Sequence, residues 1–225
     1  MVAPLIYYTA TANKQEAVRL MNKALPFLPE AVRKGILRYT YDEDRILTFS
    51  GKLLLLQVLK DLGLDHRISL ADLQYTSFSR PWFNYPVDFN ITHSGNYTLL
   101  AFTQNGKIGV DIEIIKPLGM EDYSNVFSNR EWSALQENND IGLFYWLWAR
   151  KEAVVKAIGK GLSMPLCEID VTDDLISIDN EQLQLVSIDI DKGYAAAVAL
   201  IGATSVPAPP RFIGLEACIA SCFPD

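Results

Sequence analysis

The stretch FYWLWARKEAVVKAIGKGL, residues 144–162, decides more about this chain than any other segment. On a helix it places Glu152 and Lys156 four positions apart, on the same face as Trp148. Such a pair on an exposed helix is worth only about 0.2–0.5 kcal/mol and is usually structural. Here the flanking residues are apolar on most sides, which predicts a buried helix over 141–159. Buried charges need partners or a metal ion, so the pair is a candidate functional site.

A second cluster lies upstream in ITHSGNYTLLAFTQNGKIGVDIE, residues 91–113. Side chains alternate along a strand, so Asp111 and Glu113 share one face with Gly109, with the two acidic Cα atoms about 7 Å apart. Two carboxylates at that spacing can converge on a hard cation such as Mg²⁺, and Gly109 leaves room for a ligand. The alternative is a solvated outer face of a hairpin, and two acids alone are a weak signal.

His93 and Ser94 form a third feature, directly before Gly95. A serine hydrolase built on this pair needs a geometry that adjacent residues rarely reach, and the chain has no GxSxG motif. A lone histidine is more often structural. Beside the acids, the better functional interpretation is a hydrogen bond from His93 to a phosphate oxygen. Taken together, the acids and bases predict a metal-assisted phosphate site.

Composition excludes several function classes. The chain has 225 residues and is 49% hydrophobic, enough for one large core or two small ones. A net charge of -7 without a long basic run argues against a nucleic-acid or membrane partner. No apolar run approaches the ~20 residues that span a bilayer, and the start does not resemble a secretory signal. Cys167, Cys218 and Cys222 suggest packed thiols rather than disulfides or zinc, so a cytoplasmic location is expected.

The periodicity predicts a mixed α+β fold. Helices are expected over 13–25, 30–38, 42–62, 129–137 and 141–159, and strands over 4–9, 96–104, 107–114, 166–171, 183–188 and 194–201. The dipeptide Asn105-Gly106 predicts a hairpin that joins the second and third strands. Ser128 with Glu131 predicts a capping box. The expected organisation is an N-terminal subdomain over 1–115, a C-terminal subdomain over 116–204, and a Pro-containing tail over 205–225.

Three motifs in order give a specific signal. They read Phe89-Asn90-Ile91-Thr92-His93-Ser94, then Ile108-Gly109-Val110-Asp111-Ile112-Glu113, then Trp148-Ala149-Arg150-Lys151-Glu152-Ala153-Val154-Val155-Lys156 followed by Gly159-Lys160-Gly161-Leu162. Together they resemble the 4′-phosphopantetheinyl transferases of the surfactin-synthetase-activator (Sfp) type. The looser motif Ser79-Arg80-Pro81, and Arg45 with Gly51, extend the resemblance over about residues 38–200. Thr92 replaces the usual serine but keeps the hydroxyl, and Ser79 stands where glycine is common.

The resemblance implies a fold and a reaction. The fold is a pseudo-dimer of two similar α+β subdomains with the active site at their interface. The reaction transfers the phosphopantetheine arm of coenzyme A to a serine of an apo carrier protein, acyl, polyketide or peptidyl. The products are the holo carrier and 3′,5′-ADP. Mg²⁺ is the implied cofactor, with Mn²⁺ as the alternative, and the implied oligomeric state is a monomer.

The resemblance also implies residue roles. Asp111, Glu113 and Glu152 hold the metal against the pyrophosphate, and Glu152 is a candidate base for the carrier serine. Lys156 neutralises phosphate charge and His93 donates to a pyrophosphate oxygen. The expected coenzyme A contacts also include Arg45 and Arg80 on the 3′-phosphate, together with Ser79, Pro81, Ser94 and Lys151. The carrier is expected beside segment 118–145, through Met120, Tyr123, Val126 and Phe127 unless these pack in the core.

Three alternatives remain at this stage. One is another magnesium-dependent phosphoryl enzyme acting on a nucleotide, which the absence of a P-loop or kinase glycine loop weakens. The second is a non-catalytic relative that binds carriers or coenzyme A, against which the retained acids and Lys156 argue. The third is a hydrolase built on His93 and Ser94.

Overall fold

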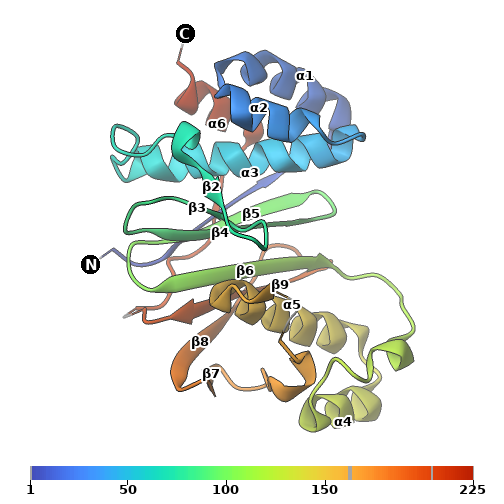
Figure 1. The fold of residues 1–225 in the computed structure, drawn as a ribbon. Helices are drawn as coiled ribbons and strands as arrows, with labels where there is room; N and C mark the ends of the chain where they lie inside the picture. Colours follow the sequence, from blue (N-terminus) through green and yellow to red (C-terminus); the bar gives the residue numbers. More distant parts are fainter. Residues whose placement is uncertain (1, 162–163, 204, 225) are drawn as a thin grey trace.

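The structure, a computed structural model, describes residues 2–161, 164–203 and 205–224. The structure contains two four-stranded sheets, with the long helix α3 above the first sheet and the long helix α5 against β6 and β9 of the second (Figure 1). The fold is therefore mixed α+β, as predicted. Leu162 of the third motif lies outside the described residues.

The first half contains a four-stranded sheet in the order β10-β1-β5-β4 and a two-stranded sheet formed by β2 and β3. Its elements are β1 (Leu5–Ala10), α1 (Lys14–Ala24), α2 (Glu30–Leu37), α3 (Asp42–Asp61), the short strands β2 (Gln74–Tyr75) and β3 (Pro81–Trp82), β4 (Asp88–Ser94) and β5 (Tyr97–Thr103). The helix α3 carries a long run of apolar residues and covers the outer face of the four-stranded sheet (Figure 1). The acids of its first turn, Asp42, Glu43 and Asp44, suit the positive end of the helix dipole.

The second half contains the other four-stranded sheet, in the order β6-β9-β8-β7. Its elements are β6 (Lys107–Ile114), a 3₁₀ turn η3 (Met120–Tyr123), α4 (Asn129–Asn138), α5 (Ile141–Ile158), β7 (Leu175–Ile178), β8 (Glu181–Ile188) and β9 (Tyr194–Ile201). The predicted capping box at the start of α4 is confirmed, because Ser128 and Glu131 exchange side-chain and backbone hydrogen bonds. Gly159 caps the C-terminus of α5, and its φ of 77° is accessible at low cost only to glycine.

Three apolar cores hold these layers together. One lies between the first sheet and α1, α2 and α3, and a second lies between the other sheet and α5. The third lies between the two sheets and includes Ile6, Leu99, Val110, Ile112 and Val198. A strand buried on both faces reads as a continuous apolar run, which is what β9 shows in YAAAVALI.

The two sheets meet along β4 and β6, a junction that we call the seam. The strands run parallel there and belong to different sheets. In place of a backbone ladder, side chains of β4 accept hydrogen bonds from the backbone N–H groups of β6. Asp88 accepts from Ile108 at 2.8 Å, Asn90 from Val110 at 3.1 Å and Ser94 from Ile114 at 3.1 Å. Polar residues at alternate positions of β4 therefore satisfy an otherwise open strand edge.

The predicted hairpin between 96–104 and 107–114 is wrong. β5 pairs with β4 through the turn at Gly95-Asn96, whereas β6 pairs with β9. Asn105-Gly106 predicts only a local turn. It does not predict the strand with which β6 pairs, because that strand, β9, lies far along the chain. Sheet membership thus changes between Thr103 and Lys107, ahead of the predicted boundary at 115.

One further prediction differs from the structure, and the structure also describes the tail, whose order the sequence left open. Residues 166–171 form a 3₁₀ turn, Leu166–Glu168, rather than a strand, because the carbonyls of Leu166 and Ile169 accept hydrogen bonds from Lys151. The Pro-containing tail is also structured. It returns to the first half as β10 (Arg211–Phe212), parallel to β1, and as α6 (Leu215–Cys222), packed on α3.

Within the described residues, no helix combines the length and apolar character that crossing a bilayer requires.

Gly109 serves packing rather than ligand access, contrary to the expectation from sequence. A Cβ at this position would lie 2.1 Å from the Ala153 carbonyl oxygen and 2.4 Å from the Ala157 nitrogen. The backbone of α5 therefore rests directly on β6, and only glycine permits this approach.

We expect Gly109→Ala to lower the free energy of unfolding by about 1–3 kcal/mol, the usual cost of forcing an extra carbon into a packed interior. Gly35→Ala is the matched control, since a Cβ at this position of α2 would meet no described atom within 4 Å. Alanine there should stabilise the fold by about 0.5–1 kcal/mol. Urea unfolding of both variants measures the difference, and equal effects would contradict the close helix–strand contact.

Candidate active site

α5 lies across β6, and this contact brings the sequence-predicted acids and the lysine together. Asp111 and Glu113 come from β6, whereas Glu152 and Lys156 come from α5. Across the seam, β4 contributes Thr92, His93 and Ser94. Each group thus sits on a helix or strand, which holds it more rigidly than a loop would.

The centre of the site is an ion pair between Lys156 and Asp111. The Lys156 Nζ lies 2.5 Å from Asp111 Oδ1, and the Asp111 side chain is only 4% exposed. The Thr92 hydroxyl completes a triangle, donating to Asp111 Oδ1 at 3.0 Å and accepting from Lys156 at 3.2 Å. The second oxygen, Asp111 Oδ2, is buried and has no hydrogen-bond partner among the described residues. Buried polar atoms are rarely left unpaired, so this oxygen is available to a ligand.

The two glutamates share this environment. The Ser94 hydroxyl donates to Glu113 Oε2 at 3.2 Å while its oxygen accepts the Ile114 N–H, which orients Glu113. Burial raises the pKa of Glu113, and the nearby Asp111 charge raises it further. Burial likewise raises the pKa of Glu152, with Lys156 opposing and Asp111 adding to the shift. Three desolvated carboxyl groups therefore share one lysine.

The three carboxylates are of the chemical type that binds a hard divalent cation. Carboxylate oxygens are the ligands that Mg²⁺ prefers, and one of them, Asp111 Oδ2, is buried and without a described partner. In the described part of the chain, however, no three His, Cys, Asp or Glu side chains stand close enough together to hold a metal as they are placed. The Lys156 ammonium occupies the position beside Asp111 that a cation would share.

His93 faces a large cavity on the first-half side. Burial, and then the Lys156 charge, lower the pKa of His93, so its imidazole is neutral near pH 7. The cavity measures about 620 Å³ and is lined by His93, Ser79 and Pro81 among others. A second hollow of about 260 Å³ adjoins it, because Ser79 and Pro81 line both, and Glu152 and Lys156 line the second. Segment 79–81 therefore lies between the larger cavity and the hollow that Glu152 and Lys156 line.

Two cations of the large cavity were missed from sequence, Arg38 and Lys52. The Lys52 side chain lies over the Tyr75 ring at 5.7 Å, and the residue is 8% exposed. Burial, and then the Arg38 charge, lower its pKa to about 8. Among the described residues no carboxylate pairs with Lys52. The sequence feature that could have identified Lys52 is a single lysine within the apolar run of a buried helix.

Lys151 does not belong to the site. Its side chain is 1% exposed and pairs with the fully buried Glu131 at 2.7 Å. It also donates to the Leu166 and Ile169 carbonyls. The expectation that Lys151 binds pyrophosphate is therefore corrected: this ammonium ties α5 to α4 and to the 166–169 segment, and it cannot reach a ligand.

Both arginines expected on coenzyme A also have protein partners. Arg45 donates to the Tyr39 carbonyl at 2.7 Å and to Asp42 at 3.2 Å, at the start of α3. Arg80 pairs with Asp88 at 2.7 Å and reaches the seam. The structure thus offers Arg38 and Lys52, rather than these two, as the cations that line the large cavity.

The fold and the site together define an α+β protein with an acidic, lysine-containing centre where two sheets meet. Residues 107–199 match the family described as the 4′-phosphopantetheinyl transferase superfamily. The chain is 31% identical to the 4′-phosphopantetheinyl transferase ffp of Bacillus subtilis over 86% of this chain and 89% of that protein. It is 30% identical to the 4′-phosphopantetheinyl transferase Sfp of Bacillus subtilis (strain 168), with the same coverage. The 4′-phosphopantetheinyl transferase AcpT of Escherichia coli (strain K12) is 32% identical over 56% of this chain and 69% of that protein. The chain belongs to the 4′-phosphopantetheinyl transferase superfamily, which confirms the resemblance drawn from the motifs.

The raised carboxyl pKa values have a consequence for stability. A carboxyl group whose pKa is raised by folding holds its proton more tightly in the folded chain, so its ionisation destabilises the fold. That penalty is absent below the unfolded-state pKa of about 4.3 and complete above the raised folded-state pKa.

We therefore expect Glu152→Gln to raise Tm at pH 7–8 by about 2–4 °C, the shift that 1 kcal/mol gives a chain of this length. The gain should fade as the pH is lowered toward 4. Glu137→Gln, an exposed position on α4, is the control and should change Tm little. Calorimetry over this pH range tests the idea, and a destabilised Glu152→Gln at neutral pH would contradict it.

Proposed function

We propose that this chain transfers the 4′-phosphopantetheine arm of coenzyme A to a serine of an apo carrier protein, giving the holo carrier and 3′,5′-ADP. The observation that supports this most directly is the group formed by Asp111, Glu113, Glu152 and Lys156 beside a cavity lined by cations. The serine that reacts belongs to the carrier. This agrees with a site in which the chain supplies charges and hydrogen bonds rather than a nucleophile.

Coenzyme A fits the large cavity by charge and size. Its volume of about 620 Å³ lies within the range of cofactor pockets. Arg38 and Lys52 face it and suit the phosphates of the 3′,5′-ADP end, while Ser79 and Pro81 form its wall toward the acids. His93, neutral at its lowered pKa, can donate a hydrogen bond to a pyrophosphate oxygen.

We propose Mg²⁺, or alternatively Mn²⁺, held by Asp111, Glu113 and Glu152. When bound, it would neutralise charge on the pyrophosphate. The chain's own residues account for the remaining chemistry. The carrier serine oxygen attacks the phosphorus that bears the pantetheine arm, and the P–O bond to 3′,5′-ADP breaks. Glu152, with its raised pKa, accepts the serine proton, and the Lys156 ammonium stabilises the charge at phosphorus.

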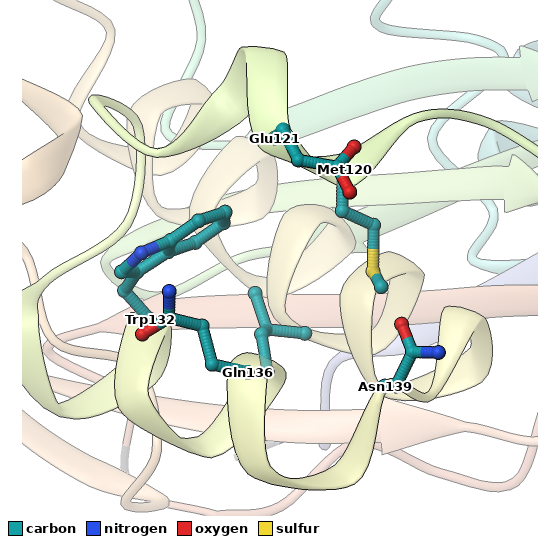
Figure 2. A pocket seen from close by; sticks show the side chains of 6 residues that line it. Met120, Glu121, Trp132, Gln136 and Asn139 are labelled. Atoms are coloured by element: carbon teal, nitrogen blue, oxygen red, sulfur yellow. The ribbon is translucent and has the colours of Figure 1, made fainter.

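The carrier would dock on the second half. A pocket of about 260 Å³ lies between η3 and α4, lined by Met120, Trp132, Leu135 and their polar neighbours (Figure 2). Tyr123 of η3 packs edge-on against Trp148, which lies one turn before Glu152. The 3₁₀ turn η3, which forms one side of the pocket, is thus in contact with α5, the helix that carries Glu152. Phe127, expected as a docking residue, is buried at 3% exposure and belongs to the core instead.

We further propose that the protein is a cytoplasmic monomer that binds neither nucleic acid nor membrane. Its three cysteines are free in the structure, which suits a reducing compartment. Its net charge of -7 would repel anionic lipid and nucleic acid.

Intact-mass spectrometry tests the reaction itself. An apo carrier protein incubated with this chain, coenzyme A and Mg²⁺ should gain the mass of phosphopantetheine, and EDTA should prevent the gain.

Lys156→Ala should slow transfer by about 10²–10³-fold, the usual effect of removing one transition-state charge. Asp111→Ala should abolish it. Persistent transfer by Asp111→Ala would mean that the metal site lies elsewhere, and no mass gain on acyl, polyketide or peptidyl carriers would overturn the proposed reaction.

Met120→Asp tests the docking pocket, because it replaces an apolar side chain of the pocket wall with a second carboxylate beside Glu121. We expect the KM for the carrier to rise about tenfold or more, while the KM for coenzyme A is unchanged. The matched control is Leu175→Asp, an apolar residue on β7 that is 70% exposed. Similar carrier kinetics for both variants would place the docking surface elsewhere.

A further inference from the structure

A tight turn presents Arg80 to the junction of the two halves. The Arg80 N–H donates to the Thr76 hydroxyl at 3.2 Å, and the Thr76 N–H donates to the Arg80 carbonyl at 2.9 Å. Between them, Ser79 has a φ of 61°, in the left-handed region. That conformation is strained for a residue that carries a Cβ. Such strain persists only where surrounding contacts hold it. Here those contacts are made by the side chain of Arg80, the residue directly after Ser79.

The Arg80 guanidinium joins three elements. Its Nη2 lies 2.7 Å from Asp88 Oδ2 on β4 and 2.9 Å from the Ile108 carbonyl on β6. Its Nη1 donates to the Lys156 carbonyl on α5. The Arg80 side chain is only 15% exposed. Asp88 Oδ2 also accepts the Ile108 N–H at 2.8 Å, so this arginine continues the seam into the catalytic helix.

The contact with α5 falls at the helix end. α5 finishes at Ile158, so the Lys156 carbonyl is one of the last four, which lack intrahelical donors. A cation at a helix C-terminus is stabilising, and a planar guanidinium can bind several acceptors at once where an ammonium cannot. Gly159, directly after the helix, lies beside this contact: a Cβ there would be 3.8 Å from Arg80 Nη1, an ordinary van der Waals distance.

We propose that Arg80 is a positioning residue for catalysis. It holds the C-terminal turn of α5 against the seam and thereby fixes where Lys156 and Glu152 meet Asp111. The residue whose ammonium contacts Asp111 is the one whose carbonyl Arg80 binds. This inference rests on the proposed role of Lys156. It assigns to Arg80 a different task from reading the 3′-phosphate of coenzyme A, because both terminal nitrogens are already committed to protein acceptors.

The two roles predict different kinetics. A positioning residue affects the geometry of the reacting groups, so its loss lowers kcat, and a displacement of about 1 Å can cost about 10²-fold. A phosphate-reading residue affects binding, so its loss raises the KM for coenzyme A more than for 3′-dephospho-coenzyme A.

The experiment compares Arg80→Ala, Arg80→Lys and the control Arg67→Ala, which alters an exposed arginine outside the site. Transfer to one apo carrier is measured with coenzyme A and with 3′-dephospho-coenzyme A. For Arg80→Ala we expect kcat to fall about 10²-fold, with the ratio of the two KM values unchanged. Arg80→Lys should not recover kcat, whereas added guanidinium ion should restore part of it to Arg80→Ala. An unchanged kcat, or a selective rise in the KM for coenzyme A, would overturn the proposal.

A second variant covers the case in which Arg80→Ala does not fold. Asp88→Asn keeps an oxygen for the Ile108 N–H but removes the charge that holds the guanidinium. It should lower kcat about tenfold with the KM ratio again constant, and wild-type kinetics would count against the proposed role.

Hydrogen exchange separates this inference from the reaction itself. The amides of residues 155–159 should exchange at least tenfold faster in Arg80→Ala or Asp88→Asn than in Arg67→Ala. Equal exchange rates in the Arg80 and Arg67 variants would overturn the proposal that Arg80 holds the C-terminal turn of α5. A wild-type chain that transfers nothing to any carrier, yet shows this exchange difference, would overturn the proposed reaction while leaving the contact of Arg80 with α5 in place.

Discussion

The structure depends on the seam between β4 and β6. Two sheet edges meet there without sharing a ladder, and the side chains of Asp88, Asn90 and Ser94 accept the N–H groups that β6 would otherwise leave open. A net hydrogen bond of this kind is worth about 1 kcal/mol, but leaving a buried donor unpaired costs about 1–3 kcal/mol. The polar residues of β4 are therefore as necessary to the fold as the apolar core between the sheets.

The same junction creates the site. Thr92 of β4 and Asp111 of β6 meet across it, and α5 lies close enough to bring Lys156 to both because Gly109 has no side chain. Packing desolvates three acids around one lysine, which raises their pKa values and costs stability at neutral pH. Such a cost is usual where a fold holds groups ready for a ligand.

Basic residues divide into two groups that look alike in the sequence. Lys151, Arg150 and Arg80 are occupied by backbone carbonyls and by acids. The acids that pair with Lys151 and Arg80 are mostly buried, whereas Asp174, which pairs with Arg150, is exposed. Arg38 and Lys52 face an open cavity instead. The difference lies in what surrounds each side chain: Lys151 meets Glu131 of α4, a contact between helices that no motif describes, whereas Lys52 meets no described acid and keeps a lowered pKa.

The sequence by itself determined the α+β class, the capping box at Ser128, the helix over 141–158 and the acids that would face it, because periodicity and short motifs are local properties. Only the tertiary structure decided that β6 pairs with β9, that residues 211–222 return to the first half, and that Arg80 and Lys151 bind protein groups. These outcomes depend on contacts between distant segments. Packing between distant segments determines which strands pair and which charged residues form ion pairs. The residues adjacent in the chain do not predict that packing.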